Sequence, residues 1–154
     1  MSHLLVLVIV ERIPPHPYAQ AQVQVKELLS PYFRRGGYDP SLPNSHLYKC
    51  DGWGIGGRYD GLIFGKEQHY NLTPFEYRKR YGWDVIKPED NIRSVSEVPK
   101  DMIQHIDALV TPDGEWHGRE EKAGDEWVSE LTTIITEISL HYPSLLAVAV
   151  DCHY

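Results

Sequence analysis

The chain has 154 residues, of which 42% are hydrophobic, and it carries a formal net charge of -7. This length and composition indicate a single globular domain, residues 1–154, with a hydrophobic core, and they exclude a disordered chain. The acidic balance argues against a nucleic-acid binder, which would show a basic face, and no segment is long and apolar enough to span a membrane.

The first predicted element is a strand at residues 4–10, an apolar run rich in β-branched residues that ends before Pro14-Pro15. Such a run is typical of a strand buried on both faces. The opening lacks the positive region and the small-residue cleavage site of a signal peptide. We therefore expect a cytoplasmic protein in which Cys50 and Cys152 stay reduced, with a single disulfide between them as the alternative. These cysteines form no CxxC pair, which excludes a structural zinc site of thiolates.

A helix is predicted next, because apolar residues recur every three or four positions from Pro17 to Tyr32. Pro31 and the pair Gly36-Gly37 end this helix. A loop with two prolines then leads into a glycine-rich stretch.

The glycine-rich stretch, CDGWGIGGRYDG, contains five glycines. Nucleotide-binding loops of the GxGxxG or GxxxxGK type need a helix directly after the glycines, whereas a strand or turn follows here. Glycine inside a strand marks a bulge, a bend or the close approach of another group. We interpret Gly56-Gly57 as a bend, with a bulge needed only for packing as the alternative. The bend would aim three side chains: Trp53, Arg58 and Asp60.

Arg58 is the positively charged member of this stretch. Its guanidinium can hold an anionic ligand with a planar array of five donors. The alternative is an ion pair with a nearby carboxylate, for which Asp60 stands two residues away.

A long polar segment at about residues 65–100 is predicted to be an insertion. Within it, Thr73, Pro74 and Glu76 form a capping box that predicts a short helix to about Tyr81.

The last third of the chain shows strong local signals. Pro112 and Gly114 predict a tight turn, and a long apolar stripe that Pro143 ends predicts the clearest helix of the chain. The elements expected here are a strand at residues 106–111, a returning segment at 115–117, a helix at 124–142 and a strand at 145–150.

This order of elements predicts an α+β fold: a ferredoxin-like βαββαβ antiparallel sheet with both helices on one face and an insertion before the third strand. The first strand is apolar on both sides, so its second face also needs a cover. We predict a homodimer built on that open face, because aliphatic side chains left in water commonly mark an interface. The insertion is the alternative cover.

Two further motifs carry candidate catalytic groups. In TPDGEWH, packing explains Trp116, whereas neither the turn nor packing requires His117. In the terminal DCHY, Asp151 and His153 share one face of the last strand. A carboxylate and an imidazole at this spacing can bind a divalent metal or orient one another for proton transfer. A solvated chain end is the alternative.

The three stretches GWGIGGRYDG, ALVTPDGEWH and LLAVAVDCHY together resemble those of a family of small uncharacterised proteins from bacteria and their phages. Its members carry an IGGR-aromatic-x-G stretch, a VTPDGxWH stretch and a DCH near the C-terminus. The resemblance implies a shared design without implying an activity. The residues of that design are Gly56, Gly57, Arg58, Asp113, Trp116, His117, Asp151, Cys152 and His153.

Two functions are expected as alternatives. One is a small-molecule enzyme or ligand-binding protein with an Arg/His/Asp-lined pocket on the sheet, its anionic ligand held by Arg58. The other is a non-catalytic interaction module whose open sheet face binds a partner chain. The sequence identifies neither a cofactor nor a metal. The candidate catalytic residues are His117, Asp151 and His153, and the candidate ligand-binding residues are Trp53, Gly56, Gly57, Arg58, Asp60 and Trp116.

Overall fold

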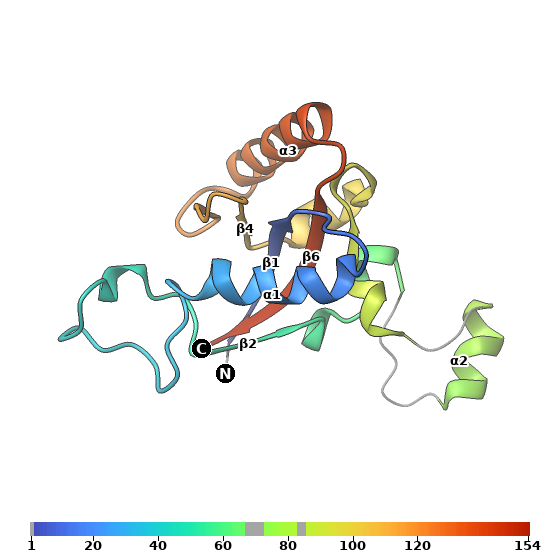
Figure 1. Cartoon of the computed structure of the whole chain (residues 1–154), viewed down its shortest axis with the longest axis horizontal. Helices are drawn as coiled ribbons and strands as arrows, with labels where there is room; N and C mark the ends of the chain where they lie inside the picture. The colour runs from blue at the N-terminus through green and yellow to red at the C-terminus, as the bar shows by residue number, and fades with distance from the viewer. Residues whose placement is uncertain (1, 67–72, 83–85) are drawn as a thin grey trace.

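The computed structural model describes residues 2–66, 73–82 and 86–154 (Figure 1). Within those residues, none of the helices combines the length and the apolar character needed to cross a bilayer. The strands and α-helices in chain order are β1 (His3–Val10), α1 (Pro17–Leu29), β2 (Gly52–Ile55), α2 (Pro74–Tyr81), β3 (Ile92–Ser94), β4 (Ala108–Val110), β5 (Trp116–Gly118), α3 (Gly124–His141) and β6 (Leu146–His153).

The strands form one mixed six-stranded sheet, which confirms the α+β class. The order is β2-β6-β1-β4-β5, and β3 pairs with the end of β6 that β2 leaves free. β1 and β4 are parallel, whereas the other pairs are antiparallel. The pairing of β1 with β6 runs from His3 opposite His153 to Val10 opposite Leu146, and it forms the centre of the sheet.

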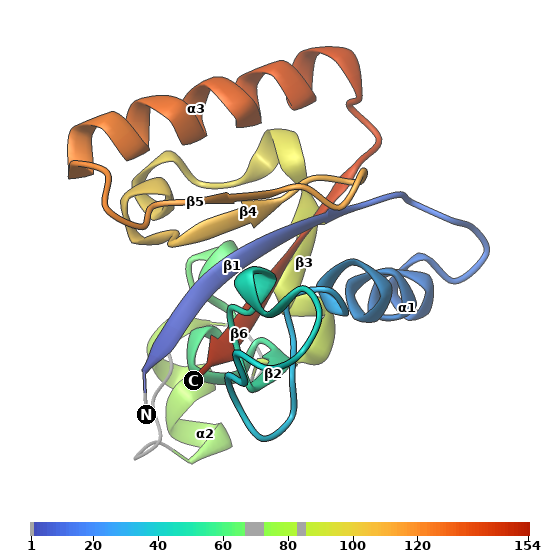
Figure 2. The same cartoon turned by 90° about the vertical axis from the view of Figure 1, so that its left-hand side faces the viewer.

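Helices α1 and α3 lie on opposite faces of the sheet (Figure 2). The prediction that both helices share one face is therefore wrong. The physical reason lies in β1, whose side chains alternate between two cores and are apolar on both sides. The α3 core takes Leu5, Leu7 and Ile9, and the α1 core takes Val6, Val8 and Val10.

The face that was expected to be open is also covered by the end of the predicted insertion. Val95 and Val98, with Met102 just beyond, are buried in the same core as α3. Residues 67–72 and 83–85 of the insertion lie outside the described residues. The predicted homodimer and the predicted interaction module both required an open apolar face, and the structure covers that face. The homodimer stays an untested prediction.

The strand order also differs from the ferredoxin-like prediction, in which the last strand lies at an edge. Here the turn after β4 returns the chain at once as β5, which occupies the place beside β4. β2 pairs with β6 instead, so β6 lies inside the sheet. This position suits β6, because all its residues except His153 are buried.

The local helix signals are confirmed. Thr73 caps α2, accepting a 3.2 Å hydrogen bond at Oγ1 from the backbone N–H of Glu76. Pro74 stands in the first turn, as the capping box predicts.

Because each helix buries one face of the sheet, truncating a core leucine on either helix should destabilise the fold. Leu29→Ala in α1 and Leu131→Ala in α3 each shorten a fully buried side chain. We expect each to lower the free energy of unfolding by about 2–5 kcal/mol, measured by urea denaturation. Leu140→Ala is the matched control, since Leu140 is 71% exposed. A Leu29→Ala variant as stable as this control would contradict the packing of α1 on the sheet.

Candidate functional site

The candidate site lies at the end of the sheet where β1 starts and β6 finishes, and Figures 1 and 2 show the two chain termini beside each other there. His3 pairs with His153 across these strands, with ring centroids 5.8 Å apart. Asp151 precedes His153 by two residues and shares its face of β6. We call His3, Asp151 and His153 the His–Asp cluster.

Asp151 is the buried member of the His–Asp cluster, with 6% of its surface exposed. Its Oδ1 is hydrogen-bonded to Nδ1 of His3 at 2.8 Å. Its Oδ2 accepts a hydrogen bond of 2.9 Å from the backbone N–H of Arg58. A buried carboxylate is tolerated when it is paired in this way, and the two contacts hold both carboxylate oxygens in place.

The glycines before Arg58 make room for the cluster. A Cβ at Gly52 would overlap the imidazole of His153, and a Cβ at Gly57 would lie 2.6 Å from Oδ2 of Asp151. Gly56 and Gly57 have φ values of 78° and 51°, a region that favours glycine. The predicted bend at this pair is therefore confirmed, and it brings the backbone against the polar cluster.

The His–Asp cluster has the composition of a metal-binding site. Each of its three residues offers one ligand atom, and these atoms lie within 4.8 Å of one another. In the part of the chain that the structure describes, no other group of three or more His, Cys, Asp or Glu residues comes together in this way. Two imidazoles and a carboxylate suit first-row transition metals.

Tyr59 packs near the cluster from the glycine-rich stretch. Its burial, together with the negative charges of Asp107 and Asp151, raises the pKa of Tyr59 above that of an ordinary phenol. The hydroxyl is therefore protonated at neutral pH and can act as a hydrogen-bond donor beside the site.

Trp53 lies on the other side of the sheet edge. It pairs with Cys152, whose side chain belongs to the α1 core, and it packs against that core. With Gly57 and Asp60, Trp53 lines a pocket of about 610 Å³ beside α1. The predicted ligand-binding residues of the glycine-rich stretch thus divide between this pocket and the His–Asp cluster, and Gly57 borders both.

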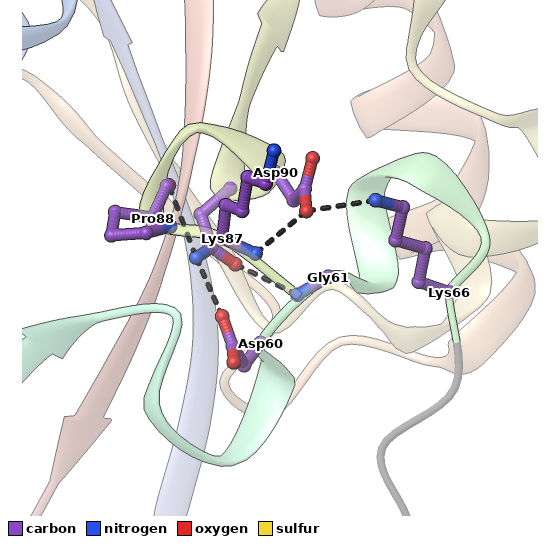
Figure 3. Close-up of polar contacts among 7 residues, drawn as sticks. Asp60, Gly61, Lys66, Lys87, Pro88 and Asp90 are labelled. Atoms are coloured by element: carbon purple, nitrogen blue, oxygen red, sulfur yellow. Dashed lines mark hydrogen bonds and ion pairs between the residues drawn. The ribbon is translucent and has the colours of Figure 1, made fainter. Parts of the chain in front are cut away.

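Asp60 belongs to a hydrogen-bond network that ties the glycine-rich stretch to the segment after α2 (Figure 3). Asn91, only 1% exposed, donates to Oδ1 of Asp60 at 2.7 Å and accepts from the backbone N–H of Gly61 at 2.9 Å. Lys66 and Asp90 form an adjacent ion pair of 2.8 Å. These contacts give the Asp60 carboxylate a bracing role.

The structure does not bring His117 and Trp116 to the cluster. Both lie on β5, and three strand spacings, roughly 14 Å, separate β5 from β6. His117 lies 3.7 Å from Glu115 instead. Trp116 packs against Tyr32, with ring centroids 5.1 Å apart. Of the three predicted catalytic residues, Asp151 and His153 meet, and His117 stands apart.

Cys50 and Cys152 are both free and fully buried on the α1 side of the sheet. The hydrogen bond that the Cys152 thiol donates to Cys50, together with burial, raises the pKa of Cys152. Its thiol therefore stays protonated. Its side chain lies in the α1 core, on the face of the sheet opposite the His–Asp cluster.

Reasoning from the sequence missed His3, which takes the place expected for His117. His3 stands in front of an apolar strand and carries no motif of its own. His3 can be recognised as a site residue only when the first and last strands are paired antiparallel and in register, because this pairing sets His3 opposite His153.

The chain matches no protein-family model, no curated protein and no solved structure. The resemblance to the bacterial and phage family therefore stays a prediction from its three motifs.

Gly52→Ala should displace the imidazole of His153, whereas Gly54→Ala should leave it in place. Both glycines lie in β2, but a Cβ at Gly54 meets nothing within 4 Å. We expect Gly52→Ala to shift the NMR signals of the His153 ring and to lower the free energy of unfolding by about 1–3 kcal/mol. Gly54→Ala should change stability by less than about 1 kcal/mol. Equal effects of the two variants would contradict the packing of His153 on Gly52.

Proposed function

We propose that the protein binds a small anionic molecule at this end of the sheet and acts on it through the His–Asp cluster. The observation that carries the proposal is the environment of Asp151, a buried carboxylate held by a backbone amide and an imidazole. A second imidazole, that of His153, has a ligating nitrogen within 4.8 Å of the other two groups.

The cluster contains more polar chemistry than packing requires. Upstream on the same face of β6, Ala147 and Ala149 fill the core with apolar atoms. Burial of a carboxylate among such groups lowers stability unless every oxygen finds a partner. A strand that keeps Asp151 and His153 at its end therefore supports a functional role.

Arg58 supplies the positive charge for the ligand. Its backbone N–H is bound to Asp151, which holds the residue beside the cluster. Its side chain is exposed, and no hydrogen bond or ion pair engages its guanidinium among the described residues. The expected pair with Asp60 is not formed, because Asp60 is bound to Asn91. An unengaged guanidinium suits the two oxygens of a carboxylate or a phosphate.

Arg58→Ala should weaken the binding of small anions without unfolding the protein, because the substitution keeps the backbone N–H that Asp151 accepts. A panel of carboxylates and phosphates is screened by thermal shift on the full chain. We expect the affinity for the best ligand of the panel, obtained from its thermal shift, to fall by a factor of about 10. A fall of this size corresponds to the loss of one charge-assisted contact.

Arg35→Ala is the matched control, since Arg35 is also an exposed arginine and forms no hydrogen bond with the described residues His3, Asp151 or His153. Anion binding that is equal in Arg58→Ala, Arg35→Ala and the unaltered protein would overturn the role of Arg58. A large fall in the melting temperature of Arg58→Ala without ligand would identify Arg58 as a structural brace.

A further inference from the structure

We infer that the His–Asp cluster binds one divalent transition-metal ion, with one imidazole nitrogen from each of His3 and His153 and a carboxylate oxygen of Asp151 as ligands. The inference rests on the site of the proposed function and names the cofactor through which the cluster acts. It depends on the positions of three side chains and not on the anion that Arg58 is proposed to hold.

The distances fit one ion. Zinc bonds to histidine nitrogen and carboxylate oxygen measure about 2.0–2.2 Å, so two ligands of one ion lie roughly 3–3.5 Å apart. Nδ1 of His3 and Oδ1 of Asp151 are already 2.8 Å apart. The three ligand atoms lie within 4.8 Å. Rotation of the third side chain, with a shift of its ligand atom on the order of 1 Å, brings all three atoms within bonding distance of one ion.

The chemistry of the donors selects the class of metal. Mg²⁺ and Ca²⁺ are bound through oxygen, whereas imidazoles suit zinc, iron, copper and nickel. Two histidines and one carboxylate form a three-ligand set that leaves at least one coordination position open, as in catalytic zinc sites and in non-haem iron sites. The side chain of His3 is 22% exposed, so the open position has access to solvent.

The surroundings orient the ligands. The backbone N–H of Arg58 holds Oδ2 of Asp151 and thereby leaves Oδ1 directed at His3. The contact with Gly52 sets the position of the His153 ring. Partners that fix metal ligands from behind in this way typically raise metal affinity by 10- to 100-fold.

A bound ion joins the cluster to the proposed ligand. In the absence of metal, His3 and Asp151 share a hydrogen bond. Metal binding at Nδ1 of His3 would replace this hydrogen bond, and the imidazole proton would move to Nε2. The ion then presents a Lewis acid at the end of the sheet, beside the residue proposed to hold the anion.

Metal binding is measured on the full chain after removal of metals with a chelator and dialysis. Zn²⁺ is titrated by calorimetry, and Co²⁺ is followed by its visible absorption, with Mg²⁺ as the comparison metal. We expect one Zn²⁺ per chain, a Co²⁺ spectrum without a thiolate charge-transfer band, and no binding of Mg²⁺. His3→Gln and His153→Gln should each weaken Zn²⁺ binding by roughly 100-fold or more.

His141→Gln is the matched control, because His141 also lies beside a carboxylate, 3.5 Å from Glu137, but on the exposed face of α3. It should bind Zn²⁺ as the unaltered protein does. No Zn²⁺ binding by the unaltered protein, or binding unchanged in both cluster variants while circular dichroism shows them folded, overturns the inference. A thiolate band overturns it too, since the metal would then lie at the cysteines.

The two variants keep the test decisive if one of them fails to fold, because each removes a different ligand. The readout also separates this inference from the proposed function. Metal binding is measured without any anion, and anion binding is compared between two arginine variants that leave all three metal ligands intact.

Discussion

The pairing of β1 with β6 is the constraint on which the rest of the structure depends. The two strands run antiparallel through eight residues each, and nearly all of those residues are buried. Strands that are apolar on both sides cannot lie at a sheet edge or carry cover on one face only, because either arrangement leaves aliphatic side chains in water. Outer strands on both sides of the pair and a cover on each face follow from this requirement.

The same pairing creates the site. Antiparallel register brings the start of β1 beside the end of β6, so His3 meets Asp151 although 148 positions separate them. The apolar alternation of β6 stops at that end, where Asp151 and His153 follow Ala149 on the face toward α3. Gly52 in the neighbouring strand and Gly57 just beyond it then let a ring and a carboxylate pack where any side chain would collide with them.

Asp151 links the two proposals made for this site. One carboxylate oxygen is held by the amide of Arg58, and the other faces His3. The first contact keeps the arginine next to the cluster, and the second is the one that a metal ion would take over. A buried carboxylate with imidazole neighbours lowers stability compared with an apolar core, and natural proteins accept such costs mainly at functional sites.

The sequence by itself determined the long helices, the central strands and the α+β class, but not the short strand β3, because hydrophobic period, prolines, glycines and the Thr73 cap act over a few residues. It also indicated that Asp151 and His153 share a face, and it offered a bend at Gly56-Gly57 beside the alternative of a packing bulge. Only the tertiary structure decided which strands pair, which helix covers which face, and that His3 rather than His117 joins Asp151. These outcomes depend on contacts between residues far apart in the chain, because the alternation of a strand fixes which residues share a face but not which other strand it pairs with. The apolar character of β1 on both sides did require two covers, but whether a helix, an insertion or a second chain supplies each cover is decided by the path of the whole chain.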